Sequence, residues 1–339
     1  MPPSERAGQL LMVGLDVNAR RDSLDALVRD RHLGGVVLLG GWYDGTDRVR
    51  ATTRHLESVA DGSGDDPGLF LAADQEGGKV QQLRGEGFTR IPTALAQGDL
   101  SPSQLATRAA GWAAELRDAG INVNLAPVAD VVPAELGRAN DPIGQWDRQF
   151  SGDPTVVGRM ASAFIEGMHR GKVAATIKHF PGIGRITGNT DITADGITDR
   201  TTTASDPYLR PFGAGIEAGA DFVMVGSAIY SRIDPGVNAT FSKAIISDLL
   251  RGRMGYDGVV ITDDVGAAKA VAATPVGERA TKFVDAGGDI VLTARPDTVP
   301  TMHRALTRRM DEDADFAAKV AAATTRVMAL KVKLGLASC

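Results

Sequence analysis

Short runs of apolar and β-branched residues alternate with longer amphipathic stretches along almost the whole chain. The strands predicted from these runs are Gln9–Leu15, Gly34–Leu39, Leu69–Ala73, Asn122–Val128, Ala174–His179, Phe222–Ser227, Gly258–Thr262 and Asp289–Thr293. Helical periodicity is found at Ser101–Ala119, Thr155–Arg170, Ser242–Met254, Glu278–Ala286 and Asp315–Leu334. Eight strand–helix units in about 300 residues are typical of a (β/α)8 TIM barrel, an α/β fold.

A doubly wound open sheet is the competing architecture. That fold would normally carry a glycine fingerprint after its first strand, whereas the segment here is Asp16-Val17-Asn18-Ala19-Arg20. No low-complexity linker or internal repeat divides the sequence. We therefore predict one barrel domain over residues 1–339, with a C-terminal helix closing the same domain.

Composition excludes several classes of partner. The formal net charge is -5 and no block of Lys or Arg stands out, so nucleic acid is not expected to bind. No apolar run reaches the roughly 18 residues of a membrane span, and the single cysteine, Cys339, rules out an intrachain disulfide. The N-terminus lacks a signal-peptide pattern. Localisation is open: cytoplasmic if Met1 is the native start, exported if a leader precedes it. We expect a monomer.

Polar residues gather where the predicted strands end. In a barrel, the carboxyl ends of all strands meet on one face, which carries the active site. The residues expected there are Asp74, Gln75, Glu76, Asp130, Lys178, His179, Ser227, Asp263 and Asp264. Carboxylates and hydrogen-bonding groups converge in this set, with few hydrophobic side chains among them. Such a rim suits a polyhydroxylated ligand.

Two clusters on this rim have a structural as well as a functional interpretation. Asp263 and Asp264 follow a strand, where an aspartate commonly caps the next helix. Because adjacent residues leaving a strand point in opposite directions, one can cap while the other faces the barrel axis. In Asp74-Gln75-Glu76-Gly77-Gly78, a turn explains the glycines but not the three hydrogen-bonding side chains before them. We favour ligand binding there.

Other chemistries fit the rim less well. Lys178 could form a Schiff base as in barrel aldolases, but that role leaves the carboxylates unused. His179 could bind a metal ion, yet the other four histidines form no short-spaced cluster with it. Phosphate-binding barrels usually have Gly-rich loops after their last two strands, whereas Gly287-Gly288 precede the eighth. We expect neither a metal nor an organic cofactor.

Several motifs, in this order, resemble glycoside hydrolase family 3, in particular its single-domain β-N-acetylhexosaminidases of the NagZ type. The matching segments are Gln9–Gly14, Asp74–Val80, Ala126–Asp130, Arg148–Ser151, Lys178–Gly184 and Ile261–Asp264. Lys79 replaces the arginine of the family's D-(Q/H)-E-G-G-R-V block. The resemblance covers nearly the whole chain.

The resemblance implies a retaining exo-glycosidase that removes terminal β-linked N-acetylglucosamine through a covalent glycosyl-enzyme intermediate. Asp263 would be the nucleophile. The residues expected to bind the saccharide are Asp74, Glu76, Arg84, Asp130, Arg148, Lys178, His179 and Ser227. Peptidoglycan, chitin fragments and glycoconjugates all remain open as natural substrates.

The sequence departs from the family pattern at the acid/base. That pattern, K-H-F-P-G-H-G followed by D-(S/T)-H, ends in a catalytic histidine, but this chain has Ile183 in the first motif and Asn189-Thr190-Asp191 in the second. In one hypothesis, Asp191 is the acid/base, protonated through partial burial or a neighbouring anion and positioned by a hydrogen bond that Asn189 donates. Asp195 is a second candidate.

A second hypothesis gives this segment no catalytic role. Asp191 would then belong to a simple Asx-turn. The protein would be a weakened relative that binds saccharide, or a β-glycosidase with another sugar specificity.

Overall fold

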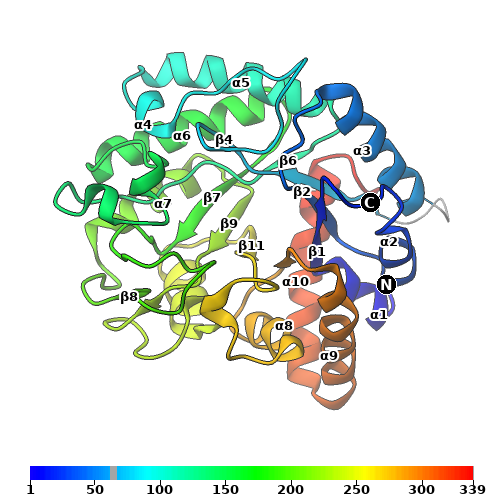
Figure 1. Ribbon diagram of the computed structural model, residues 1–339. Helices are drawn as coiled ribbons and strands as arrows, with labels where there is room; N and C mark the ends of the chain where they lie inside the picture. Colours follow the sequence, from blue (N-terminus) through cyan, green and yellow to red (C-terminus); the bar gives the residue numbers. More distant parts are fainter. Residues whose placement is uncertain (62–66, 339) are drawn as a thin grey trace.

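A computed structural model describes residues 1–61 and 67–338, and Cys339 lies outside the described residues. Eight parallel strands form one sheet in the order β11-β9-β7-β6-β3-β2-β1-β12 (Figure 1). Their bounds are β1 Leu11–Asp16, β2 Gly35–Leu39, β3 Phe70–Ala73, β6 Val123–Asn124, β7 Ala174–Phe180, β9 Phe222–Val225, β11 Val259–Thr262 and β12 Val291–Thr293. A bridge between Ile261 and Ile290 brings β11 against the start of β12 and closes the barrel.

Helices surround this barrel on its outer side (Figure 1). The α-helices are α1 Pro3–Gln9, α2 Asp25–Arg31, α3 Thr46–Ala60, α4 Ala94–Gln97, α5 Pro102–Asp118, α6 Pro154–Arg170, α7 Arg210–Glu217, α8 Val276–Asp285, α9 Val299–Glu312 and α10 Ala314–Lys333. Shorter 3-10 helices are η1 Gly137–Ala139, η2 Gly144–Trp146, η3 Pro207–Leu209, η4 Ala239–Phe241, η6 Lys269–Val271 and η7 Pro296–Thr298. A π-helix, η5, spans Ala244–Arg253.

Two small strand pairs lie outside the barrel sheet. They are β4 Gln75–Gly77 with β5 Val80–Gln81, which are antiparallel, and β8 Thr198–Asp199 with β10 Ile229–Tyr230, which are parallel. The first pair directly follows β3 and forms a hairpin above the barrel's carboxyl end. Neither pair was predicted from the sequence, because two- and three-residue strands are too short to show a period.

The structure confirms the predicted barrel, and each predicted strand overlaps an observed one, with β1 and β7 each ending one residue later than predicted. The largest difference is at Asn122–Val128, where only Val123 and Asn124 form the strand. Pro127 has no N–H to donate to the ladder, and regular pairing resumes only as a bridge between Val128 and Lys178. The helix expected at Ser242–Met254 is present but is wound as a π-helix, with a hydrogen bond from the Met254 N–H to the Leu249 carbonyl.

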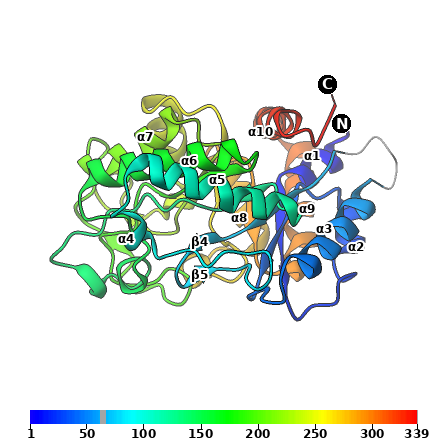
Figure 2. The ribbon, with the colours of Figure 1, turned by 90° about the horizontal axis from the view of Figure 1, so that it is seen from above.

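The amino ends of the strands lie under helix α10. Lys331 is fully buried there and donates to Gln9 Oε1 at 2.6 Å, and Lys333 pairs with Asp221 at 2.7 Å. Gln9 lies two residues before β1, and Asp221 lies directly before β9. These two contacts therefore attach α10 to the amino end of the barrel. Figure 2 shows α10 on the side opposite the β4–β5 hairpin. The functional face is therefore the hairpin side.

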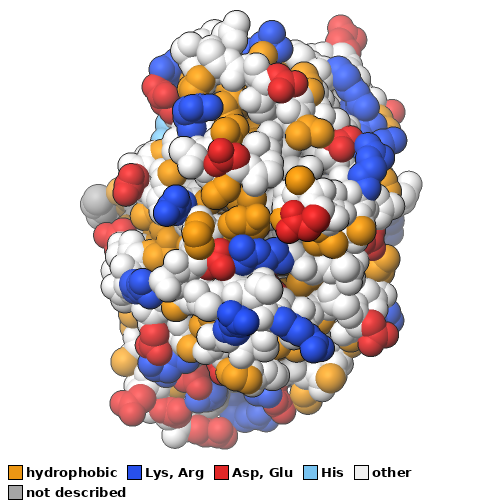
Figure 3. Space-filling view, turned by 90° about the vertical axis from the view of Figure 1, so that its left-hand side faces the viewer, with side chains coloured by type: hydrophobic (Ala, Val, Ile, Leu, Met, Phe, Trp, Pro, Cys, Tyr) orange, Lys and Arg blue, Asp and Glu red, His pale blue; other side chains and the backbone are white. Residues whose placement is uncertain are grey.

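Charges of both signs are mixed on the surface. Figure 3 shows basic and acidic side chains interspersed on one face, with apolar side chains between them. Within residues 1–61 and 67–338, no helix is both long and apolar enough to cross a membrane.

Candidate active site

A pocket of about 280 Å³ opens at the carboxyl ends of the strands. Its polar lining comes from the ends of β3, β7 and β11, from Arg148 in the loop between β6 and α6, and from the loop after β7. Six of the ten residues predicted for the site line it: Asp74, Arg148, Lys178, His179, Asp191 and Asp263. Segments that are more than 180 residues apart in the sequence thus meet at one place, because parallel strands share one carboxyl edge.

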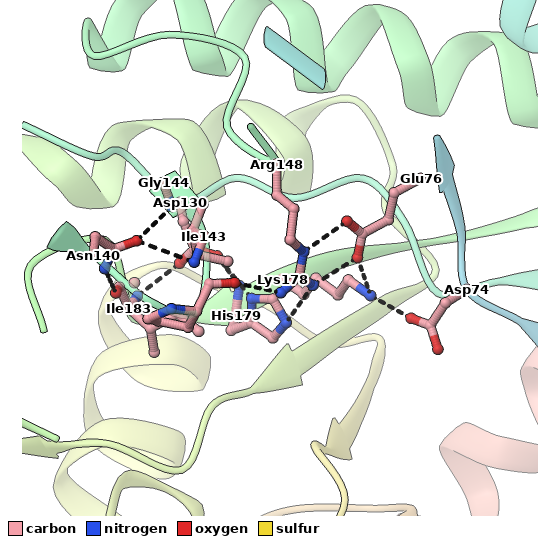
Figure 4. Close-up of polar contacts among 12 residues, drawn as sticks. Asp74, Glu76, Asp130, Asn140, Ile143, Gly144, Arg148, Lys178, His179 and Ile183 are labelled. Atoms are coloured by element: carbon pink, nitrogen blue, oxygen red, sulfur yellow. Dashed lines mark hydrogen bonds and ion pairs between the residues drawn. The ribbon is translucent and has the colours of Figure 1, made fainter. Parts of the chain in front are cut away.

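Two cations and two carboxylates form a chain along one wall (Figure 4). Lys178 Nζ lies 2.5 Å from Asp74 Oδ1 and 2.8 Å from Glu76 Oε1. Arg148 grips Glu76 with two parallel hydrogen bonds, 2.9 Å from Nε to Oε2 and 2.7 Å from Nη2 to Oε1. Planar, bidentate pairing of this kind fixes the guanidinium in one orientation.

Burial and neighbouring charges act in opposite directions on the pKa values of Glu76 and Lys178. Burial alone disfavours the ionised form of Glu76, but the charges of Arg148 and Lys178 outweigh it and lower the pKa of this carboxyl to about 2. Burial also disfavours the Lys178 ammonium, yet Asp74 and Glu76 raise its pKa above the ordinary value. Glu76 and Lys178 are therefore both charged at neutral pH. Lys178 does not have the lowered pKa that a Schiff-base lysine needs.

The local sequence explains why Asp74 and Glu76 reach the pocket wall from one loop. The β4–β5 hairpin turns sharply at Gly77, whose φ is 113°. A Cβ atom at Gly77 would lie only 2.2 Å from the Pro92 carbonyl oxygen, so no larger residue fits. Gln75 supports the same turn through paired hydrogen bonds with the Leu83 backbone, at 2.9 and 3.0 Å. It is thus a structural residue.

His179 is oriented by a buried carboxylate. Its Nδ1 lies 2.7 Å from Asp130 Oδ2, and Asp130 Oδ1 accepts a hydrogen bond of 2.7 Å from the Ile183 N–H. We assign the Nδ1 proton from this partner, which turns the other ring nitrogen, Nε2, away from Asp130. Arg148 Nη2 lies 3.5 Å from that nitrogen. Nε2 consequently faces the side of the pocket where Arg148 lies.

Asp263 and Asp264 both line the pocket, and the expectation that one of them caps the next helix is wrong, because the helix that follows, η6, has Ala268 at its N-cap. Asp264 caps its loop, accepting hydrogen bonds from the N–H groups of Gly266, Ala267 and Ala294 at 2.7 to 3.0 Å. Asp263 lines the pocket, and its Oδ1 accepts only from the Asp264 N–H at 2.9 Å among the bonds of the described chain. The Asp263 carboxylate therefore keeps an oxygen for a ligand.

Asp191 is held in the pocket wall by its backbone. Its carbonyl accepts a hydrogen bond from the Lys269 N–H at 3.1 Å, and the Thr190 carbonyl accepts one from Ala270 at 3.0 Å. The expectation that Asn189 donates a hydrogen bond to Asp191 is wrong, because Asn189 Oδ1 accepts from the Asp191 N–H at 3.1 Å. An asparagine side chain readily meets the N–H two residues later, which makes this an Asx-turn.

The Asp191 carboxyl is perturbed. The residue is exposed at the pocket mouth, yet the surrounding walls exclude water from part of it. This partial burial, followed by the negative charge of Asp263, raises the pKa of Asp191 to about 6. His179 and Arg148 oppose the rise without cancelling it. Close to neutral pH, this carboxyl can thus both give and take a proton.

Four of the predicted site residues do not line the pocket. Glu76 lies behind Lys178 and Arg148, and Asp130 lies behind His179; both carboxylates are buried and fully paired. The sequence places them at the right strand ends but does not reveal that other side chains stand between them and the pocket.

The other two residues face elsewhere. Ser227 is buried against Thr240, 3.3 Å from its hydroxyl. The Arg84 guanidinium stacks 4.5 Å from the centre of the Tyr43 ring. Asp195, the second acid/base candidate, is exposed and is absent from the pocket lining among the described residues.

Apolar side chains form much of the pocket, contrary to the expectation of few hydrophobic groups. Strand residues contribute most of them, and the set is Val37, Leu39, Val80, Leu125, Ile183, Met224 and Leu292. Five of them, Val37, Leu39, Leu125, Met224 and Leu292, lie in strands that were predicted from apolar runs. The uppermost inward-facing side chains of a barrel line the site itself.

Nothing in the arrangement resembles a metal centre. Within the described ranges, no group of three or more His, Cys, Asp or Glu side chains is placed to hold a metal ion. The carboxylates that converge here are instead neutralised by Lys178 and Arg148 or face the pocket.

Comparison with known proteins agrees with this geometry. A crystal structure of a β-N-acetylhexosaminidase from Beutenbergia cavernae is 46% identical, covers 98% of both chains and superposes with a TM-score of 0.94. Proteins named β-hexosaminidase from Xanthomonas euvesicatoria and Stenotrophomonas maltophilia are 39% and 41% identical over 240 and 247 residues; the alignments cover 68% of this chain and 69% and 68% of theirs. With residues 4–330 matching the model of the glycosyl hydrolase family 3 N-terminal domain, the chain belongs to glycosyl hydrolase family 3.

Proposed function

We propose that the protein is a retaining exo-glycosidase that hydrolyses terminal β-linked N-acetylglucosamine. The observation that carries this proposal is the pair Asp263 and Asp191, which face one pocket, together with the pKa of Asp191, which is raised to about 6. Retaining glycosidases need one ionised carboxylate as nucleophile and one protonated group as acid. Relatives named β-hexosaminidase, at about 40% identity, supply the sugar class.

The pocket wall supplies the groups that hold the sugar. Asp74 accepts hydrogen bonds from hydroxyl groups, and Arg148, with Lys178, donates to hydroxyl oxygens. His179 accepts through Nε2. Because each of these side chains is already fixed by an ion pair or hydrogen bond, little conformational entropy is lost when the sugar binds. Glu76 and Asp130 act from behind as positioning residues.

In the first chemical step, an Asp263 oxygen attacks the anomeric carbon and forms an ester with the sugar. The bond from that carbon to the glycosidic oxygen breaks, and the leaving oxygen takes the proton from Asp191. In the second step, Asp191 removes a proton from water, whose oxygen attacks the anomeric carbon and releases Asp263 as a carboxylate. Two inversions at one carbon retain the configuration.

Charge coupling between the two carboxyls helps Asp191 to change roles. The negative charge of Asp263 is one cause of the raised pKa of Asp191. That charge disappears when Asp263 becomes an ester, so the Asp191 pKa falls once the proton has been given away. Asp191 therefore holds its proton before the first step, when its pKa is raised, and stays ionised as a base during the second step, when its pKa is lower.

The pocket's size suits removal of one sugar at a time. Its volume of about 280 Å³ lies at the small end of ligand pockets, which favours a single ring over a bound chain. The monomer expected from the sequence stays a prediction.

A trapping experiment tests the proposal. Wild type and Asp263→Asn would be assayed with p-nitrophenyl N-acetyl-β-glucosaminide, and a slow 2-deoxy-2-fluoro glycoside would be used to accumulate the intermediate for peptide mass spectrometry. We expect turnover only in wild type and an adduct on the peptide that contains Asp263. Saccharide binding without turnover would contradict the proposal, and a borohydride-trapped adduct on Lys178 would replace it with an aldolase mechanism.

A further inference from the structure

Asn140 is a fully buried polar residue in the loop between β6 and α6, outside the pocket lining. Its side-chain amide uses every hydrogen-bonding position that it has. Nδ2 donates to the carbonyl oxygens of Ile183 at 2.9 Å and Ile186 at 2.7 Å, and Oδ1 accepts from the N–H groups of Ile143 at 3.1 Å and Gly144 at 2.7 Å (Figure 4). Two donors and two acceptors are the full capacity of an amide.

One side of Asn140 supports Arg148. The turn at Ile143 and Gly144 is preceded by Pro142, whose carbonyl accepts from Arg148 Nη1 at 2.8 Å. The Ile143 carbonyl in turn accepts from the Arg148 N–H at 3.3 Å. The turn that Asn140 Oδ1 fixes therefore positions both the backbone and the guanidinium of Arg148, which is proposed to bind the sugar.

The other side of Asn140 supports the segment that carries Asp191. Ile183 and Ile186 lie in the loop after β7, and Asp191 follows five residues after Ile186. The loop's far end is fixed by Lys269 and Ala270, as described above. The stretch between these attachments has no regular secondary structure, and besides its two ends it is held where the Thr187 and Gly188 N–H groups donate to the Gly196 carbonyl at 3.1 and 3.0 Å.

We infer that Asn140 is a positioning residue that sets the placement of Asp191 relative to Arg148. Arg148 holds the sugar and Asp191 protonates its leaving oxygen, so a shift of one loop against the other separates the acid from its target. This inference rests on the proposed function and adds a residue to it. No other side chain of similar size supplies two donors and two acceptors in the same plane.

Asn140→Asp removes the hydrogen bonds to the Ile183 and Ile186 carbonyls and keeps those from the Ile143 and Gly144 N–H groups. A carboxylate still accepts from Ile143 and Gly144, but it sets an oxygen against the carbonyl oxygens of Ile183 and Ile186. We expect a 10- to 100-fold loss of kcat on N,N′-diacetylchitobiose, whose leaving group needs a proton, since misplacement by about 1 Å can cost about 100-fold. For the 2,4-dinitrophenyl glycoside, whose leaving group needs no proton, kcat/KM should be almost unchanged because it reports the first step alone, and the Kd for N-acetylglucosamine should also be unchanged.

Asn122→Asp is the matched control. Asn122 also bridges two backbone segments with its amide, donating to the Leu69 carbonyl at 3.0 Å and accepting from the Leu71 N–H at 2.9 Å, but it precedes β6 at the opposite end of the barrel. We expect a lower Tm and no change in leaving-group dependence. If Asn140→Asp does not fold, Asn140→Ser takes its place in the same comparison.

A double mutant separates positioning from general loss of structure. If Asn140 acts through Asp191, then Asn140→Asp should cause little further loss of kcat on chitobiose in an Asp191→Asn background. Equal losses on both leaving groups, or a full additional loss in the double mutant, would overturn the inference while leaving the proposed function standing. An Asp191→Asn variant with no leaving-group dependence would instead remove the proposed acid itself.

Discussion

The pH dependence of turnover gives a quantitative test of Asp191 as the acid. Its pKa is raised to about 6 by partial burial and by Asp263. An acid with this pKa is about 90% protonated at pH 5, about 10% at pH 7 and about 1% at pH 8. For a substrate with a poor leaving group, kcat/KM should therefore fall about tenfold between pH 5 and pH 7, and about tenfold again by pH 8.

The assay compares two leaving groups in two variants across pH 5 to 8. Asp191→Asn should lose about 100- to 10,000-fold in kcat/KM on chitobiose and lose its alkaline decline. Its slow second step, seen as a lower kcat on the 2,4-dinitrophenyl glycoside, should recover partly with azide, which needs no base. The 2,4-dinitrophenyl glycoside should show no such decline in either protein. Asp195→Asn is the matched control, since Asp195 lies on the same loop and is exposed outside the pocket. An Asp191→Asn enzyme that keeps the alkaline decline would refute the assignment.

Stability also depends on this carboxyl. The pKa of Asp191 is higher in the folded protein than the ordinary value of 3.8. Its contribution to folding is thus fully present below about pH 4 and is lost as pH rises through about 6. Asp191→Asn removes the anion beside Asp263 and should raise the Tm at pH 8 more than at pH 4. Its loss of activity on chitobiose, in contrast, should be larger at acidic pH, where the wild-type carboxyl is protonated. Calorimetry at the two pH values checks this, and an equal change at both would argue against the coupling.

Asp263→Asn should reduce turnover of every glycoside to background while the Tm stays high, measured by initial rates and melting curves; residual turnover that scales with leaving group would assign the nucleophile elsewhere. Glu76→Gln leaves Arg148 and Lys178 with an uncompensated buried charge and should lower the free energy of unfolding by about 3 kcal/mol at pH 7, with the difference from wild type shrinking as pH falls from about 4.5 towards 2, where Glu76 is protonated. Lys331→Met removes a buried amine whose pKa burial lowers to about 7, so its gain in Tm should be largest below pH 7 and small at pH 10. Added phosphate should not accelerate turnover, because ionised Asp191 repels the anion in the second step; sugar 1-phosphate as the main product would contradict this.

The fold could be predicted because the strands of a barrel are buried on both sides and read as apolar runs. β3 and β7 are buried at every position and were located to within one residue at each end. β6 could not be bounded in the same way, since the apolar run continues past Asn124 while Pro127 interrupts the ladder. Apolarity reports burial, and burial extends further along this segment than pairing does.

The site could be predicted as a set of residues but not as an arrangement. Strand ends placed Asp74 and Glu76 together, yet only the hairpin turn at Gly77 decides that one faces the pocket and the other lies behind Lys178. Nothing in the sequence indicated that Asn140 matters, because it lies in an irregular loop without hydrophobic periodicity. Its proposed role depends on hydrogen bonds to backbone carbonyls more than 40 residues away.

The attachment of residue 191 through its backbone makes the acid interchangeable. The N–H groups of Lys269 and Ala270 donate to the main-chain carbonyls at positions 191 and 190, and these bonds do not involve the Asp191 side chain. Replacing that side chain therefore changes the proposed proton donor and keeps the backbone hydrogen bonds that hold the loop. We therefore expect histidine or glutamate at position 191 to fill the role proposed for Asp191 with a different pKa, which would shift the working pH of the enzyme.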